Sequence, residues 1–504
     1  MKRFSRVIFP TLVVIMAIGA FAYGSHERRT QQQALINRAR MHASAGPWLR
    51  EAQSDGGIQR GGTLPRNVAD NSFADIFQSD SPYGTFQNVY QLLKDQYVEG
   101  VPSDTPLAYG ASQALLASLD EPNSRYILPD ERKAIDQQDD GVYPGSGLLF
   151  TVRKTTGTDD LTTRKITVIG VIPDSPADKA GFKTGDVVTG VNNHWVIAYD
   201  PFQAEMKQFK KLVKDQVALE KAYTATETKV KDGITLSKAQ AALNIGGATP
   251  LIVTVERSGA PKPITATLDV SVPTKVQSIV SKTLDDGAGY IRFLTFNNTT
   301  VASYDKAVAQ FSDDKGLVLD LRDCPGGQIS PAIAIANSLV RGAELGRIVM
   351  RDNTVKATDP NLGFGTRVQG LKAGSSTPVI AHSFKGKIVV LVNAGTANTA
   401  ELLAAFVRDH VGGRVVGETT FGDGMAQTLF PMADGSGFTL TTGVLQTDTG
   451  KKLNMAGITP DVPIADAAIR GTNDVALAKA DSLLSLPPLK VEAIKPLQPA
   501  SISL

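Results

Sequence analysis

The chain has 504 residues, of which 42% are hydrophobic and 20% are charged, and its formal net charge is +2. This length exceeds what one hydrophobic core usually serves, so several domains are expected, and the composition is globular rather than disordered or fibrous. The near-neutral charge, without a basic stripe interleaved with aromatics, gives no electrostatic case for nucleic-acid binding. The single cysteine, Cys324, excludes an intramolecular disulfide, and five scattered histidines form no zinc-like cluster, so we expect no metal and no cofactor.

The first residues have the pattern of an export signal. The basic start MKRFSR precedes an apolar run of 17 residues at 7–23, where small residues at Ala20 and Ala22 would suit cleavage. The run is also long enough to remain in the bilayer as an anchor, so a cleaved signal and an inner-membrane anchor both stay open. We expect an exported, periplasmic or cell-envelope protein, with residues 1–25 as the signal or anchor and residues 26–80 as a polar tether.

A small helical unit is predicted at residues 81–135. In the segment 83–99, apolar residues that include Phe86 and Val89 recur on one face of an amphipathic helix. A second helix is predicted at 106–119, and the unit ends in the polar stretch DEPNSRYILPDE.

Residues 136–275 have the pattern of a small, strand-rich domain with an insertion. KITVIGVI and PLIVTVERSG are typical of strands, and SKAQAALNI is typical of a helix. Between them, a charged helix-forming stretch at about 200–233 places Met206, Phe209 and Val213 at helical spacing. This insertion is interpreted as a solvated helical excursion, with a partner-docking arm as the alternative.

From residue 276 onwards, strand-like and helix-like segments alternate. GYIRFLTF, GLVLDLRD and KIVVLVN are buried-strand patterns, and helical patterns follow each of them. This rhythm predicts an α/β core with a mostly parallel sheet over 276–486, followed by a tail at 487–504.

Two turns of this core follow buried strands. LRDCPGG places Gly326 and Gly327 at the carboxyl end of one strand, where α/β sheets bind ligands and where glycine lets backbone N–H groups approach a substrate carbonyl. NAGTANTAE places Asn398 at the start of a helix, where the dipole and free N–H groups favour negative charge. Asn398 is equally compatible with a simple helix N-cap.

Taken in order, the motifs from residue 83 to 486 resemble the carboxyl-terminal processing peptidases, also called tail-specific proteases. The segments that carry the resemblance are DEPNSRYILPDE, PDSPADKAGFKTGDVVTGVN, GYIRFLTF, LDLRDCPGG, GTANTAE, VVGETTFGDGMAQ and AGITPDV. These proteins are serine peptidases. The resemblance to them implies a multidomain α/β (α+β) protein. Its expected parts are a crotonase/ClpP-like peptidase core, an inserted-type PDZ domain over 136–275 and the N-terminal helical unit.

The chain differs from the family at the positions of the nucleophile and the general base. The resemblance places the nucleophilic serine of GTASASE at Asn398 and the general-base lysine of FGKG at Asp423, with the same spacing of 25 residues. It also implies that Gln427 stands where a glutamine supports the lysine. The backbone of Gly326, Gly327 and Thr399 would complete an oxyanion hole.

An amide nitrogen is not a useful nucleophile, and a carboxylate cannot replace a neutral amine beside a developing oxyanion. We therefore expect a pseudopeptidase, in which the Asn398 amide would donate to the Asp423 carboxylate. The alternative is an active endopeptidase with a relocated nucleophile, for which Thr399 or Cys324 are the candidates.

The resemblance also implies peptide binding by the PDZ domain, through β-augmentation and capture of a terminal carboxylate. The residues predicted for that loop are Gly145, Ser146, Gly147 and Leu148. Expected partners are protein C-termini or unfolded segments, an active paralogue or a second copy, and a membrane only through the N-terminal segment. A scaffold that binds no peptide is the remaining alternative.

Overall fold

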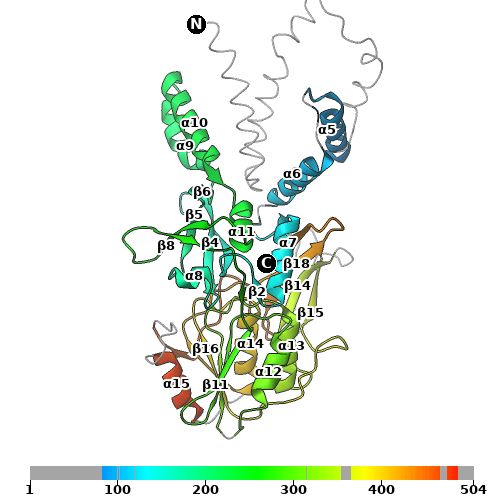
Figure 1. The fold of residues 1–504 in the computed structure, drawn as a ribbon, viewed down its shortest axis with the longest axis vertical. Coiled ribbons are helices and arrows are strands. Elements are labelled where there is room, and N and C mark those ends of the chain that lie inside the picture. Colours follow the sequence, from blue (N-terminus) through cyan, green and yellow to red (C-terminus); the bar gives the residue numbers. More distant parts are fainter. Residues whose placement is uncertain are drawn as a thin grey trace, which may run out of the picture. The chain divides into compact units, whose positions relative to one another are not determined.

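The chain divides into two compact units, Met1–Asp120 and Glu121–Leu504, in the computed structural model shown in Figure 1. The predicted signal or anchor, the tether and the C-terminal tail lie outside the described residues. Within the described ranges, no helix combines the length and the apolar character of a membrane span. The described residues are 82–98, 100, 103–119, 121–313, 315–352, 365–465 and 474–485.

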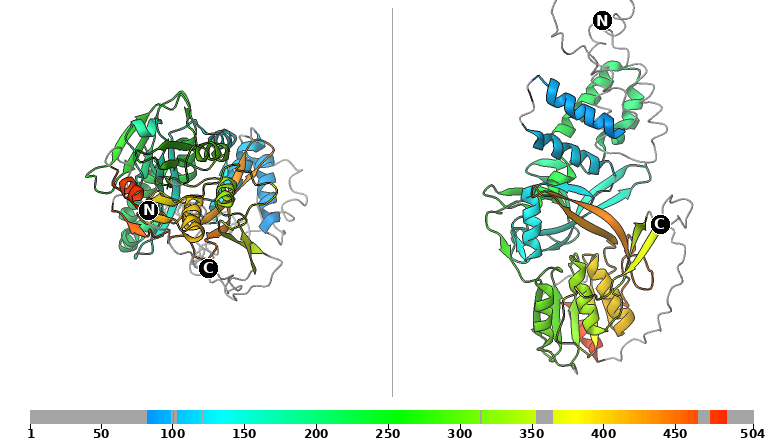
Figure 2. Two further views of the ribbon diagram at one scale, coloured as in Figure 1. Left: turned by 90° about the horizontal axis from the view of Figure 1, so that it is seen from below. Right: turned by 90° about the vertical axis from the view of Figure 1, so that its right-hand side faces the viewer.

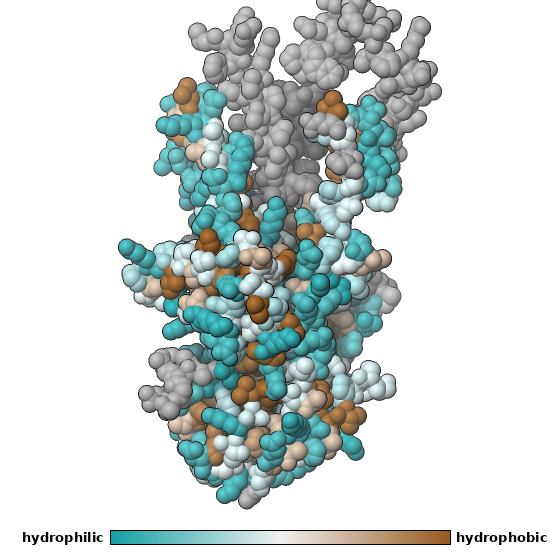
Figure 3. Space-filling model, in the orientation of Figure 1, coloured by the Kyte–Doolittle hydropathy of each residue, from teal (hydrophilic) through white to brown (hydrophobic). Residues whose placement is uncertain are grey.

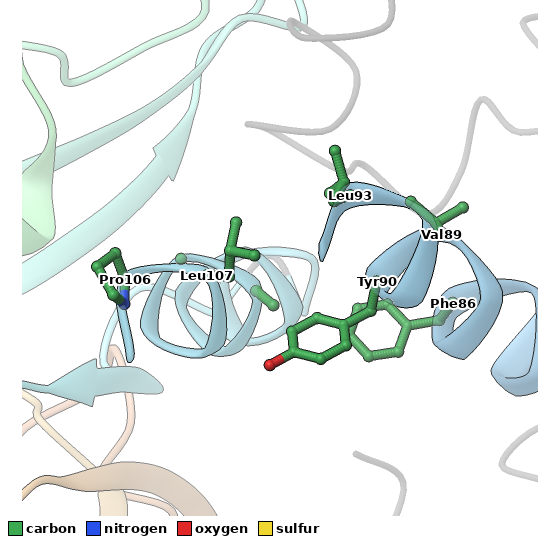
Figure 4. A pocket seen from close by; sticks show the side chains of 8 residues that line it. Phe86, Val89, Tyr90, Leu93, Pro106 and Leu107 are labelled. Carbon is green, nitrogen blue, oxygen red and sulfur yellow. The ribbon is translucent and has the colours of Figure 1, made fainter. Parts of the chain in front are cut away.

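The first unit contains the two predicted helices, α5 (Pro82–Gln96) and α6 (Asp104–Ala117). Apolar residues of both helices, including Phe86, Tyr90 and Leu107, line a hollow of about 270 Å³, shown in Figure 4. The side chain of Phe86 remains 52% exposed, so the amphipathic pattern of α5 is present but its apolar face is only partly covered.

The segment after the first unit packs into the second. Strand β1 (Arg125–Ile127) pairs antiparallel with β19 (Gly437–Gln446), and helix α7 (Pro129–Asp139) follows it. The buried Glu131 of α7 accepts two hydrogen bonds from the Arg125 guanidinium, at 2.6 and 2.8 Å. These contacts place residues 121–135, which the sequence grouped with the helical unit, in the second unit.

The strand-rich domain is built on a seven-stranded sheet with β3 at one edge. Its two longest strands, β3 and β4, pair antiparallel over their whole length, and helix α11 packs over them through Ala239 and Leu243. Alternate residues of β4, Ile166 and Val168, are fully buried, as the period of two in a half-buried strand requires. The elements are β3 (Leu148–Thr156), β4 (Thr162–Val171), α8 (Pro176–Lys179), β5 (Val187–Val191), β6 (His194–Val196), β7 (Gly233–Ile234), α11 (Leu236–Asn244), β8 (Leu251–Glu256) and β9 (Ile264–Leu268).

The predicted insertion is a helical hairpin between β6 and β7. It consists of α9 (Pro201–Leu212) and α10 (Gln216–Lys231), each begun by an aspartate that accepts hydrogen bonds from the first turn. The helices are held together by Phe209, which is 3% exposed and stacks on Tyr223 with ring centroids 4.1 Å apart. The periodic apolar residues therefore serve partly to close the hairpin.

The α/β core has a six-stranded sheet in the order β11-β12-β13-β16-β17-β20. All neighbours in it are parallel except β11 and β12, which confirms the predicted α/β class with a mostly parallel sheet. The strands are β11 (Ile279–Thr283), β12 (Gly289–Phe293), β13 (Leu317–Asp320), β16 (Ile388–Val392), β17 (Arg414–Gly417) and β20 (Val462–Pro463).

Helices cover both faces of this sheet (Figures 1 and 2). Leu317 and Leu319 of β13 pack in the cluster formed with α12 (Thr300–Val308), α13 (Ile329–Leu339) and α14 (Thr399–Phe406). Val318, between them, packs in the opposite cluster with α15 (Val475–Leu484). Burial on both faces explains why the strands read as continuous apolar runs in the sequence.

A second, antiparallel sheet carries the later strands of the core. Its order is β1-β19-β14-β15, with β18 also paired to β19. The loop that leads into β18 contains Asp423, so this sheet positions the second predicted site residue. Its remaining strands are β14 (Arg347–Asp352), β15 (Gly365–Gly370) and β18 (Met425–Pro431).

Candidate active site

Asn398 occupies a sharp turn between a parallel strand and a helix. Strand β16 ends at Val392, and α14 begins at Thr399, with Asn398 as its N-cap. The Asn398 backbone has φ 52° and ψ −118°, a left-handed conformation that non-glycine residues rarely adopt. Such strain persists where surrounding contacts fix it, and it is concentrated at functional sites.

The contacts of the Asn398 side chain differ from the expected amide–carboxylate pair. Its Nδ2 donates to the backbone carbonyls of Asp423, at 3.2 Å, and Met425, at 2.8 Å. The Asp423 carboxylate instead accepts from the Thr151 hydroxyl and the Met425 N–H, both at 3.3 Å. The prediction of direct amide–carboxylate pairing was therefore wrong, because the loop turns the carbonyls of Asp423 and Met425, rather than the Asp423 side chain, toward Asn398.

The Asp423 carboxyl group lies in a desolvated position. Burial raises its pKa, nearby Glu121 adds to the rise, and the Met425 and Thr151 hydrogen bonds and the Arg153 charge oppose it. Arg153 itself, on β3, donates from Nη2 to the Phe421 carbonyl at 2.7 Å and lies 4.2 Å from the centre of the Phe421 ring. The strand-rich domain thus contacts the loop that carries Asp423.

Glu401 is a site residue that the sequence reasoning missed. It is fully buried, and its carboxylate accepts the N–H groups of Asn398 (2.8 Å), Gly422 (2.8 Å) and Asp423 (3.0 Å), together with the Thr420 hydroxyl. Burial raises the pKa of Glu401 to about 7 against these four donors. Its place three residues after Asn398, the N3 position of a capping box, was the available sequence signal.

One carboxylate therefore ties the Asn398 turn to the loop that carries Asp423. The two positions that lie 25 residues apart in the sequence are joined through Glu401 and through the Asn398 side chain. The structure thus brings the side chain of Asn398 against the backbone of Asp423.

The glycine turn lies directly against the start of α14. Gly326 and Gly327 have φ values of 89° and 128°, and a Cβ on Gly326 would lie 2.8 Å from the Thr399 nitrogen. Among the residues that the structure describes, the backbone N–H groups of Gly327 and Thr399 have no hydrogen-bond partner. Gly326 differs, because its N–H is directed to the Cys324 sulfur. Of the three predicted oxyanion donors, the Gly327 N–H is thus unpaired on an exposed residue, whereas the unpaired Thr399 N–H belongs to a fully buried one.

The candidate replacement nucleophiles are buried. Thr399 is fully buried, and its hydroxyl donates to the Gly327 carbonyl at 3.0 Å. Cys324 is fully buried in the apolar cluster beneath the sheet, and burial raises the pKa of its thiol to about 12. A thiol in this state supplies almost no thiolate at neutral pH.

The hydrogen bond of the Gln427 side chain goes to Thr441 and not to the Asp423 carboxylate. The residue is exposed on β18, and its Nε2 donates to the Thr441 hydroxyl at 2.6 Å. That hydroxyl donates in turn to Glu121 at 2.7 Å. Within the described part of the chain, no group of His, Cys, Asp or Glu has a geometry that could hold a metal ion.

The predicted carboxylate-binding turn, Gly145 to Leu148, is closed in this conformation. All four residues are buried, and both the N–H and the hydroxyl of Ser146 donate to the Leu243 carbonyl at 2.9 Å. The Leu148 N–H donates to the Ser146 hydroxyl at 3.2 Å. The expectation of a turn with accessible N–H groups is therefore corrected, because the C-terminal end of α11 covers it.

Comparison with known proteins agrees with this architecture. Residues 287–464 match the model of Peptidase family S41, and residues 146–221 match the model of the PDZ domain. The chain is 28% identical over 381 residues to the chloroplastic C-terminal processing peptidase of Tetradesmus obliquus, which covers 74% of this chain and 71% of the relative. It is 26% identical over 393 residues to a carboxy-terminal-processing protease of Bartonella bacilliformis, covering 75% and 74% respectively.

Among solved structures, the photosystem II D1 C-terminal processing protease has the same fold, with a TM-score of 0.51 and 24% identity. The match covers 79% of this chain and 90% of that one. The fold and the paired domains define a PDZ-containing protein with a family S41 peptidase core. The chain thus carries a domain of Peptidase family S41 together with a PDZ domain, and it is similar over about three quarters of its length to carboxyl-terminal processing peptidases.

Proposed function

We propose that this protein is a catalytically silent member of its family that binds protein C-termini or unfolded segments in the cell envelope. The observation that carries the proposal is the chemistry of the strained turn. The residue there is Asn398, and its amide is already bound to the carbonyls of Asp423 and Met425. The loop opposite carries a carboxylate where the family resemblance calls for an amine.

Acyl transfer needs a nucleophile and a base that removes its proton as the bond forms. The lone pair of the Asn398 amide nitrogen is delocalised into its carbonyl, so it cannot attack. Asp423 places an acidic group near a position where negative charge would develop on the substrate oxygen. Loss of either member of such a dyad removes most of the rate enhancement, because the two groups act as a unit.

Binding can survive the loss of chemistry. The unpaired N–H of the exposed Gly327 suits the carbonyl oxygen of a bound peptide, whether or not a bond is cleaved. Among the residues that the structure describes, the edge strand β3 pairs with β4 alone, which leaves one side available to a peptide in extended conformation. The predicted export segment supports a location in the cell envelope.

The direct test is to restore the dyad. The natural protein, Asn398→Ser, Asp423→Lys and the double variant would each be incubated with an unstructured substrate protein, and new termini would be counted by mass spectrometry. We expect cleavage by the double variant alone, since each single variant still lacks one member. Robust cleavage by the natural protein would refute the proposal.

A scaffold or regulator of an active paralogue is the second candidate, and the closed turn at Ser146 favours it. If the PDZ domain captures terminal carboxylates, a free-acid peptide should bind more tightly than the same peptide with an amidated end. Equal and negligible binding of both peptides would favour the scaffold. Co-purification with a catalytically competent relative would then identify the regulated partner.

A further inference from the structure

The outer end of the α9–α10 hairpin combines unshielded apolar and basic side chains. The hairpin tip consists of Lys210, Lys211, Val213, Lys214 and Val217. Val213 is 56% exposed and Val217 is 78% exposed, and Figure 3 shows hydrophobic residues among hydrophilic ones at this end of the hairpin. The stacked rings of Phe209 and Tyr223 hold the two helices of the hairpin together at another point. The two valines are therefore not needed for packing between the helices.

The lysines of the hairpin tip are free of intramolecular ion pairs. Among the residues that the structure describes, Lys210, Lys211 and Lys214 have no acidic partner. Asp215 is the only acid between residues 210 and 217, and its carboxylate caps α10 by accepting the Ala218 N–H at 3.0 Å. Three lysines against Asp215 leave residues 210–217 with a formal net charge of +2 around the two exposed valines.

We propose that the hairpin tip binds the surface of an anionic membrane. Lysines would contact the lipid phosphates, while Val213 and Val217 would enter the boundary between headgroups and acyl chains. Two valines offer far less area than the roughly 800 Å² per partner of a stable protein–protein interface, whereas a lipid surface needs only local insertion. Charge complementarity and small apolar area together favour lipid over a folded protein.

This contact would be distinct from the segment predicted at 7–23, which lies outside the described residues. A single weak membrane contact binds reversibly, and a basic cluster is a common second signal that strengthens attachment. The hairpin tip would fulfil that second role through headgroup charge rather than through a membrane span.

The test places an environment-sensitive fluorophore at the tip of the full-length chain, through Val217→Cys. Cys324 is fully buried and so stays unlabelled in the folded protein. Phosphatidylcholine vesicles with and without phosphatidylglycerol would be titrated in, and the emission of the tip probe would be recorded at low and high salt.

We expect a blue shift with the anionic vesicles alone, weakened by salt. Combining Lys210→Gln, Lys211→Gln and Lys214→Gln should weaken the response on the order of a hundredfold, at about fivefold per lysine. The matched control is Lys179→Gln, Lys262→Gln and Lys275→Gln, which removes the same charge from exposed lysines outside the hairpin and should leave the response intact.

Three outcomes would overturn the proposal. The first is an unshifted probe, and the second is an equal shift on both kinds of vesicle. The third is the same shift with polyglutamate in the absence of lipid, which would indicate an acidic polypeptide as the partner. Reading the probe at the tip keeps any insertion of the N-terminal segment from being mistaken for binding by the hairpin.

Discussion

The two glycine-containing turns of the second unit differ in how accessible the tertiary structure leaves them. In the core, Gly327 is exposed, and its N–H has no hydrogen-bond partner among the residues that the structure describes. In the PDZ domain, Gly147 and its neighbours are buried, and Ser146 is bonded to the Leu243 carbonyl. Glycine at both turns supplies the backbone freedom that a binding loop needs, but accessibility depends on the element packed over the turn.

Strand β3 joins these two regions. It begins at Leu148, at the end of the closed turn, and further along it Thr151 and Arg153 contact the loop that contains Phe421 and Asp423. One strand therefore connects the closed turn to the loop that carries Asp423. Four substitutions test this contrast between a closed turn and an open one.

Gly147→Ala should have the largest effect because it forces the closed turn apart. A Cβ at Gly147 would lie 2.2 Å from the Ser175 Cβ, and the φ of 80° adds backbone strain. We expect a loss of about 3–4 kcal/mol in the free energy of unfolding, from overpacking and left-handed strain. Denaturant unfolding followed by the fluorescence of Trp195, in the PDZ domain, would measure it.

The matched control is Gly181→Ala, which has a φ of 76° but open space around the new Cβ. It should cost about 1–2 kcal/mol from strain alone. Equal losses for the two variants would show that the closed turn is not tightly packed.

Glu401→Gln tests the buried carboxylate behind the open turn. The folded pKa of about 7 exceeds the ordinary value of 4.5, so the folded state holds the proton more tightly than the unfolded state. Stability from this group is therefore present below pH 4.5 and is lost as pH rises toward 7, by about 3 kcal/mol in the limit. Unfolding curves across this window should show that fall in the natural chain but not in the variant.

The control for that experiment is Glu418→Gln, in the same segment of the core but with a partly exposed side chain. Its pH profile should parallel that of the natural chain. If Glu401→Gln also parallels it, the carboxyl group does not titrate in the stated window.

Arg153→Gln should break the link between β3 and the Asp423 loop. The variant loses the 2.7 Å hydrogen bond to the Phe421 carbonyl and the stacking of the guanidinium on the Phe421 ring. We expect about 2 kcal/mol of destabilisation, together with a further rise in the Asp423 pKa. Arg153→Lys keeps the positive charge but loses the planar guanidinium. It should therefore bring the Asp423 pKa closer to that of the natural chain than it brings the free energy of unfolding.

Ser146→Ala should have the smallest effect. It removes the hydroxyl that donates to Leu243 and leaves the Leu148 N–H without its acceptor, for a loss of about 1–2 kcal/mol. Ser271→Ala, at an exposed position, should change stability by no more than about 0.5 kcal/mol. A Ser146→Ala variant as stable as the natural chain would mean that the turn is not held by this residue.

The regular parts of the fold were predictable from local patterns. Buried strands such as β13 and β16 appear as apolar runs, and the helices that follow them carry helical periodicity. The insertion between β6 and β7 was equally visible, because its charged helix-forming stretch interrupts a strand-rich domain. Residues 121–135 were expected in the N-terminal helical unit but lie in the second unit. Local patterns could not indicate this, because the pairing of β1 with β19 joins positions more than 300 residues apart.

The candidate site was only partly predictable, because its contacts also join residues far apart in the sequence. Motif order placed Asn398 and Asp423 opposite each other, but it could not indicate that the asparagine amide would bind backbone carbonyls rather than the carboxylate. The role of Glu401 depends on three N–H groups from two separate loops, which come together only in the folded chain.

The sequence alone determined which elements form and which residue types stand at the two turns, because these follow from hydrophobic period and from side-chain chemistry. Tertiary structure alone decided that the turn at Ser146 is closed by Leu243 while the turn at Gly327 stays open. The physical reason is that burial and hydrogen-bond partners are properties of neighbours in space, and those neighbours lie far away along the chain.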